Sequence, residues 1–167
     1  MEHPQPTMQH QKHHEMQGKH YGKLIVMAVL SFISMYILMY AMVDKLSNVY
    51  TNINQFYMAG LMTMPMIIIE VVLMRSMYMN KKLNAGIIIV SVLALIGFFL
   101  CIRQQTAVSE RQFLRGMIPH HAAAILMSRK NPAKDPQIVK LQQEIISSQE
   151  REIAEMKAIL ERMKKEQ

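Results

Sequence analysis

The sequence has one cysteine, Cys101, among 167 residues. A single cysteine cannot form an internal disulfide bond, and it excludes a metal site built on a CxxC pair. The chain also has no phosphate-binding loop, no paired carboxylates on one helix face and no nucleophile beside a general base. These absences predict a protein that is not an enzyme, and they leave histidine, methionine and carboxylate side chains as candidate metal ligands.

Three long stretches have almost no charge. Residues 24–43 and 83–102 contain no charged side chain, and residues 56–74 contain one, Glu70. A helix needs ~20 such residues to cross the ~30 Å hydrocarbon layer of a membrane. We therefore expect a membrane domain of three transmembrane helices over residues 24–102, with the lipid bilayer as a partner. The first stretch lies too deep in the chain to be a cleaved signal peptide.

The formal net charge of +7 would suit a nucleic-acid partner. However, the basic residues cluster beside the apolar stretches or alternate with glutamate, without interleaved aromatic side chains. No nucleic-acid partner is therefore expected.

The basic residues do predict an orientation, because cytoplasmic loops of membrane proteins carry an excess of Lys and Arg. Six flank the membrane on the N-terminal side and three on the opposite side: Lys12, Lys19, Lys23, Arg75, Lys81 and Lys82 against Lys45, Arg103 and Arg111. We expect the N-terminus in the cytoplasm and the C-terminal part outside it.

The first 23 residues are polar and contain five of the seven histidines. Pro4, Pro6 and several glutamines disfavour packed structure, so residues 1–23 are predicted to be a disordered His/Met-rich tail. Such a tail either binds metal weakly or is simply solvated.

Methionine is frequent in the second apolar stretch. Met58, Met62 and Met66 follow at intervals of four residues, and Glu70 continues the row. Methionine rows at helical spacing are commonly plain packing, but a thioether ladder could also pass on Cu(I). A carboxylate in lipid is costly, so Glu70 either reaches the membrane surface, where Arg75 is a partner, or has a functional role.

The polar C-terminal part predicts two helices. Ser109 and Asp135 are typical N-cap residues, and helices of about residues 110–130 and 136–164 follow them. Pro119 predicts a kink within the first of these helices. Two helices of about 55 residues in all cannot enclose a core, so we expect a homodimer that forms a four-helix bundle.

The candidate metal site lies on these two helices. Imidazole and thioether groups on one broad face of the first helix are suitable ligands for copper, although a core helix with methionine as filler has the same pattern. The apolar stripe of the second helix includes Glu152, whose burial is costly without a partner such as a histidine or a shared cation. The predicted metal ligands are Met117, His120, His121, Met127, Glu152 and Met156. The expected ion is Cu(I) or Cu(II), with another soft or borderline metal as the alternative.

The motif FLRGMIPHHAAAILM, followed by IISSQEREIAEMKAIL, resembles the domain of unknown function 305 family over about residues 108–163. The three apolar stretches are similar to those of membrane-anchored bacterial members. The resemblance implies a ferritin-like helical hairpin at residues 108–165, without established enzyme activity. In some members it implies a role in copper or other metal tolerance in the cell envelope. By position it also points to Gln149 beside the ligands named above.

These observations predict an all-α protein with three transmembrane helices and a soluble helical hairpin that dimerises. Its predicted function is copper sequestration or handling at the bacterial inner membrane. Two alternatives remain open: a copper-conducting transporter that uses the methionine row, and a structural dimerisation module without metal. The third apolar stretch lacks the GxxxG motif expected of close-packed helices in such a transporter.

Overall fold

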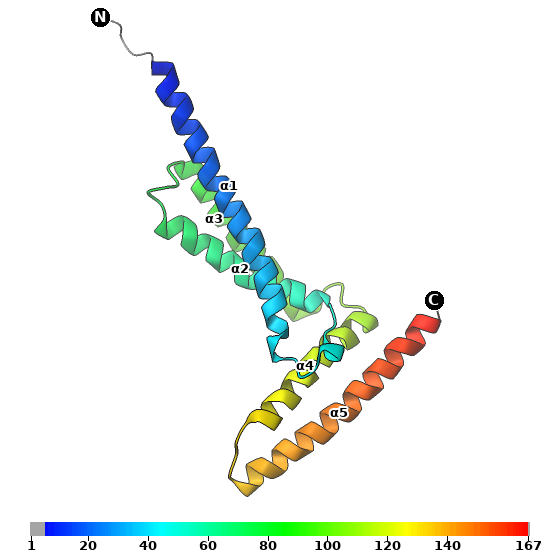
Figure 1. The fold of residues 1–167 in the computed structure, drawn as a ribbon. Coiled ribbons are helices and arrows are strands. Elements are labelled where there is room, and N and C mark those ends of the chain that lie inside the picture. The colour runs from blue at the N-terminus through cyan, green and yellow to red at the C-terminus, as the bar shows by residue number, and fades with distance from the viewer. Residues whose placement is uncertain (1–5, 167) are drawn as a thin grey trace, which may run out of the picture. The chain divides into compact units, whose positions relative to one another are not determined.

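The computed structural model describes residues 6–166, with side chains from Gly18 onward. All regular elements in this range are helical, which confirms the predicted all-α class (Figure 1). The α-helices are α1 (Pro6–Leu38), α2 (Ile53–Leu73), α3 (Lys81–Gln104), α4 (Glu110–Lys130) and α5 (Pro136–Lys165). Two short 3-10 helices, η1 (Met39–Met42) and η2 (Leu46–Asn48), lie between α1 and α2.

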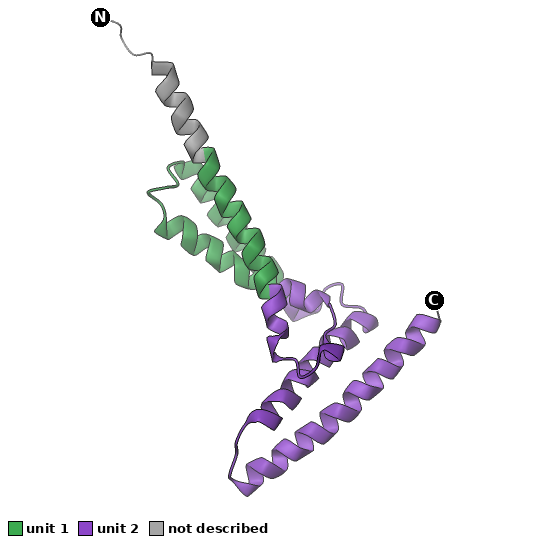
Figure 2. Cartoon of the chain, in the orientation of Figure 1, with its two compact units in different colours: residues 1–35, 58–101 green, residues 36–57, 102–167 purple. Residues whose placement is uncertain are grey.

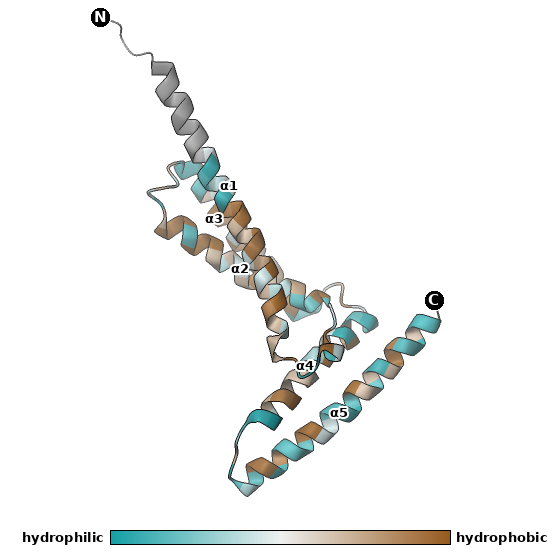
Figure 3. Cartoon of the chain, viewed as in Figure 1, coloured by the Kyte–Doolittle hydropathy of each residue, from teal (hydrophilic) through white to brown (hydrophobic). Residues whose placement is uncertain are grey.

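Within the described part of the chain, three helical segments are long and apolar enough to cross a membrane: Gly18–Met42, Ile53–Leu73 and Lys81–Gln104. They include nearly all of the three apolar stretches of the sequence, and Figure 3 shows their predominantly hydrophobic colouring. The chain is therefore a membrane protein. The first five residues of the predicted disordered tail lie outside the described residues, whereas residues 6–23 are helical because α1 begins at Pro6 and continues through them.

The chain divides into two compact units (Figure 2). The first extends to Met35 and includes Met58–Cys101, and the second consists of Tyr36–Tyr57 and Ile102–Gln167. The hairpin predicted at residues 108–165 is thus part of the second unit. This unit also includes residues 36–57, which the sequence had placed with the membrane domain.

In the first unit, α1, α2 and the loop that precedes α3 share a small core of Leu24, Val71 and Tyr78. The hydroxyl group of Tyr21 donates a hydrogen bond to Oδ1 of Asn84 at 2.7 Å, which ties α1 to α3. Glu70 accepts a hydrogen bond from the hydroxyl group of Tyr78 at 3.4 Å, and no ion pair joins it to Arg75 within the described chain.

Burial raises the pKa of Tyr78, and the negative charge of Glu70 raises it further. The hydroxyl group therefore remains protonated at neutral pH and can donate to the carboxylate. This contact gives Glu70 a local partner at the end of α2, which is Tyr78 and not the expected Arg75.

Candidate metal-binding site

Helices α4 and α5 form an antiparallel hairpin whose two N-termini are capped as expected. The side chain of Ser109 accepts a hydrogen bond from the backbone N–H of Gln112, and that of Asp135 accepts from Gln137 and Ile138. Such caps satisfy backbone donors that have no partner within a helix. Pro119 is buried inside α4, and the helix continues through it from Glu110 to Lys130.

The hairpin encloses one continuous row of buried side chains. In α4 these residues recur at intervals of three or four, as one helix face requires. The core consists of Leu114, Ile118, Ala122 and Ile125 from α4 and Ile153 and Met156 from α5. This row fixes which residues of α4 face α5.

The segment between α1 and α2 covers part of this core. Val43 and Tyr50 pack against the buried residues of the hairpin, and the hydroxyl group of Tyr40 donates to the carbonyl oxygen of Tyr50 at 2.8 Å. The backbone N–H of Ile53 donates to Oε1 of Gln112 in α4 at 3.0 Å. Part of the apolar surface of the hairpin is therefore covered within the chain.

A chain of polar contacts holds the same segment to α5. Lys157 donates from Nζ to Oδ1 of Asn48 at 2.6 Å, and Nδ2 of Asn48 donates to Oδ1 of Asp44, also at 2.6 Å. The side chain of Asp44 is only 5% exposed, and its other oxygen lies 4.0 Å from Arg129, which also pairs with Glu150. Sequence reasoning missed these contacts, because a polar loop gives no periodic pattern that identifies a distant partner.

His121 is the predicted ligand with the most defined surroundings. Its Nε2 atom lies 2.6 Å from Oε2 of Glu152 in α5, and its Nδ1 atom lies 2.9 Å from the carbonyl oxygen of Met117, one turn earlier in α4. A carbonyl oxygen can only accept, so Nδ1 carries a hydrogen. The other ring nitrogen, Nε2, faces the carboxylate of Glu152.

Two of the predicted methionine ligands, Met117 and Met156, belong to the hairpin core or pack against it. Met156 lies one turn after Glu152 and is buried, and Met117 lies one turn before His121 and packs against the same core cluster. The structure thus brings four of the six predicted ligands to one region of the hairpin: Met117, His121, Glu152 and Met156.

The other two predicted ligands, His120 and Met127, are exposed. At 100° per residue, His120 lies about 160° and Met127 about 180° around α4 from the buried Ile118, whereas His121 lies only about 60° away. The face of α4 that the sequence predicted to carry the metal ligands was too broad, because only the position of α5 defines which side of α4 is buried. Among residues 18–166, no three His, Cys, Asp or Glu side chains form a group that could hold a metal.

The segment that contains the α4–α5 hairpin matches a known protein family. The family model "Domain of unknown function (DUF305)" matches residues 102–160, which include α4 and most of α5. An uncharacterized protein of Acanthamoeba polyphaga mimivirus is 36% identical over 144 residues, which are 84% of this chain and 93% of the viral protein. No solved structure matches. On these similarities, the chain belongs to the DUF305 family.

Proposed function

We propose that this protein binds a metal ion, preferentially copper, in its α4–α5 hairpin, and that it sequesters or hands on copper at a cell membrane. No enzymatic role is part of the proposal. The observation that carries it is the contact between Nε2 of His121 and the carboxylate of Glu152.

This contact would be stabilised by a cation between the two atoms. Because Nδ1 of His121 donates to the carbonyl oxygen of Met117, a neutral ring would place the lone pair of Nε2 against a carboxylate oxygen only 2.6 Å away. A proton or a metal cation between the two atoms removes this repulsion. Metal-binding histidines commonly donate their other N–H to a backbone carbonyl, which fixes the ring and increases its basicity.

The ion pair and a metal site need slightly different geometries. Bonds of about 2.0 to 2.2 Å in a tetrahedral site separate two ligand atoms by roughly 3.3 Å, so the carboxylate must retreat by less than 1 Å. The side chain of Glu152 is 48% exposed and has room to do so. The metal would replace the shared proton, and binding should therefore weaken in acid.

The preference for copper rests on Met117 and Met156. Thioether sulfur is a soft ligand that favours Cu(I), whereas imidazole also suits Cu(II) and Zn(II). The same mixed set of ligands disfavours Ca²⁺ and Mg²⁺, which are bound through oxygen.

The proposed setting is the inner membrane of a bacterium, with the N-terminus in the cytoplasm and the hairpin outside it. The excess of basic residues on the N-terminal side supports this orientation. We further propose a homodimer, in which α4 and α5 of two chains form a four-helix bundle like that of ferritin-like proteins. Its support is the pair of apolar residues Ile138 and Leu141 in the first turns of α5, each of which is about half exposed.

The transporter alternative rests on the methionine row of α2. Met58 and Met62 are 43% and 46% exposed, so a thioether ladder built from them would form only where several chains meet. The module without metal remains the other alternative, with a proton in place of the cation between His121 and Glu152.

The proposal is tested by metal titration of the full-length protein in detergent micelles. Four N-terminal histidines, His3, His10, His13 and His14, are replaced by alanine, so that they do not compete. Cu(I), Cu(II), Zn(II) and Ag(I) are compared, and X-ray absorption identifies the ligand atoms. We expect one copper per hairpin, with both nitrogen and sulfur ligands. No tight binding of any of the four ions would refute the metal-binding proposal.

A further inference from the structure

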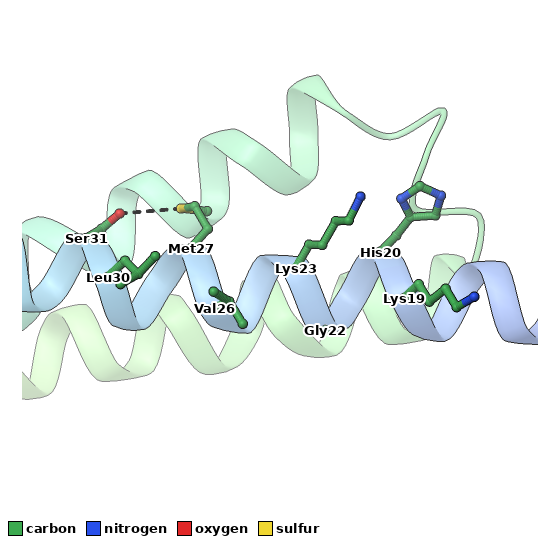
Figure 4. A pocket seen from close by; sticks show the side chains of 8 residues that line it. All are labelled: Lys19, His20, Gly22, Lys23, Val26, Met27, Leu30 and Ser31. Atoms are coloured by element: carbon green, nitrogen blue, oxygen red, sulfur yellow. Dashed lines mark hydrogen bonds between the residues drawn. The ribbon is translucent and has the colours of Figure 1, made fainter.

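A pocket of about 800 Å³ lies along α1, beside the N-terminal end of the first membrane-spanning segment (Figure 4). All of the residues that line it belong to α1. They are Lys19, His20, Gly22, Lys23, Val26, Met27, Leu30 and Ser31. The pocket is basic toward the start of the span and apolar farther into it.

Four of these residues form a narrow stripe on the helix. Counted at 100° per residue, Lys19, Lys23, Val26 and Leu30 fall within about 60° of one another. Val26 and Leu30 are each 58% exposed within the described structure. At 1.5 Å per residue, Leu30 lies about 10 Å farther along the helix than Lys23. The stripe therefore offers positive charge at the membrane surface, followed by an apolar track that enters the membrane.

The two lysines at the basic end are available to a ligand. Neither Lys19 nor Lys23 forms an ion pair within residues 18–166. The Nδ1 atom of His20 is buried, and no described group bonds to it. His20 and Lys23 extend from the same side of α1 in Figure 4.

The open space at Gly22, here called the hollow, is part of the pocket that the two lysines also line. A Cβ atom at Gly22 would meet no other atom within 4 Å, so the missing side chain leaves open space. Glycine is unfavourable within a helix by roughly 1 kcal/mol relative to alanine, and helix formation therefore gives no reason for it here.

We propose that this pocket binds an anionic phospholipid. The phosphate group lies at Lys19 and Lys23 above Gly22, and an acyl chain follows Val26 and Leu30. Charge complementarity selects an anionic head group, and the adjoining apolar track selects a lipid over a soluble anion. The site is separate from the proposed metal site and does not depend on it.

The test is native mass spectrometry of the delipidated full-length protein, titrated with phosphatidylglycerol or with phosphatidylcholine. A lysine near a membrane contributes roughly a fivefold preference for anionic lipid. We expect phosphatidylglycerol to be retained in preference to phosphatidylcholine, and the double variant Lys19→Gln/Lys23→Gln to lower this preference by about 25-fold.

Two further variants separate a defined site from general attraction by basic residues. Lys81→Gln/Lys82→Gln removes the same charge from the start of α3, which the bond between Tyr21 and Asn84 holds to the same end of the unit. This variant should retain phosphatidylglycerol within about twofold of the parent protein. Gly22→Leu keeps every charge but fills the hollow, and it should lower retention while leaving the helix content unchanged.

Equal retention of the two lipids would overturn the proposal. So would equal losses in the two double-lysine variants, since the charges would then act without a pocket. Unchanged retention by the Gly22→Leu variant would likewise show that the hollow holds no lipid.

Discussion

Nε2 of His121 lies 2.6 Å from Oε2 of Glu152, and this contact joins α4 to α5 across the hairpin. The imidazole side chain is only 11% exposed, whereas the carboxylate is 48% exposed. The imidazole of His121 is thus held by its surroundings, whereas the carboxylate of Glu152 can move. This asymmetry suits a site in which a cation enters from the solvent side and replaces a proton.

The first prediction concerns Glu152 in the metal-free protein. Glu152→Gln should lower the free energy of unfolding by less than about 1 kcal/mol, because ion pairs with an exposed partner contribute little. Thermal unfolding followed by circular dichroism measures this change. A loss of several kcal/mol would identify the contact as structural and would favour the module without metal.

The second prediction concerns Asn48, which bridges Lys157 and Asp44. Asn48→Ala should cost about 1 to 3 kcal/mol, because it leaves the buried Asp44 side chain without its hydrogen-bond donor. Hydrogen exchange of the backbone around Val43 and Tyr50 should accelerate. Ser47→Ala, at an exposed neighbouring position of η2, is the matched control and should change neither quantity.

The helices could be predicted from the sequence, because their determinants are local. About twenty consecutive apolar residues specify a membrane span, and the N-cap residues Ser109 and Asp135 mark the starts of the two helices of the hairpin. The packing of the segment between α1 and α2 on the hairpin could not be predicted, because Asn48 and Lys157 are 109 positions apart and no repeat relates them. The candidate site was predictable only in part, since His120 and His121 are adjacent in sequence but face different ways.

Topology gives the third prediction. In a Cys101→Ser background, single cysteines are placed at the exposed positions Ser76 and Ser147, which lie between α2 and α3 and within α5. A membrane-impermeant maleimide added to intact cells should label Ser147→Cys and not Ser76→Cys, because the excess of basic residues favours a cytoplasmic α2–α3 loop. The reverse labelling pattern would place the hairpin in the cytoplasm and refute the proposed envelope location.

Association gives the fourth prediction. Leu141 is 54% exposed at the far end of the hairpin, and a second hairpin would bury it. The purified protein should therefore sediment as a dimer, and Leu141→Asp should make it monomeric. Leu46→Asp, at a position that is 91% exposed in η2, should leave the dimer intact. A monomeric parent protein, or a dimer that tolerates Leu141→Asp, would exclude this mode of association.

The adjacent histidines provide the most direct test of the proposed metal site. Copper affinity is measured for His120→Ala and His121→Ala in the full-length protein that lacks the four N-terminal histidines. The two variants remove the same chemical group from neighbouring positions, but only His121 faces Glu152. We expect His121→Ala to weaken copper binding by at least about 10- to 100-fold, the loss typical of disrupted metal sites. His120→Ala should remain within about threefold of the parent protein. Undiminished copper binding by His121→Ala would contradict the assignment of the site.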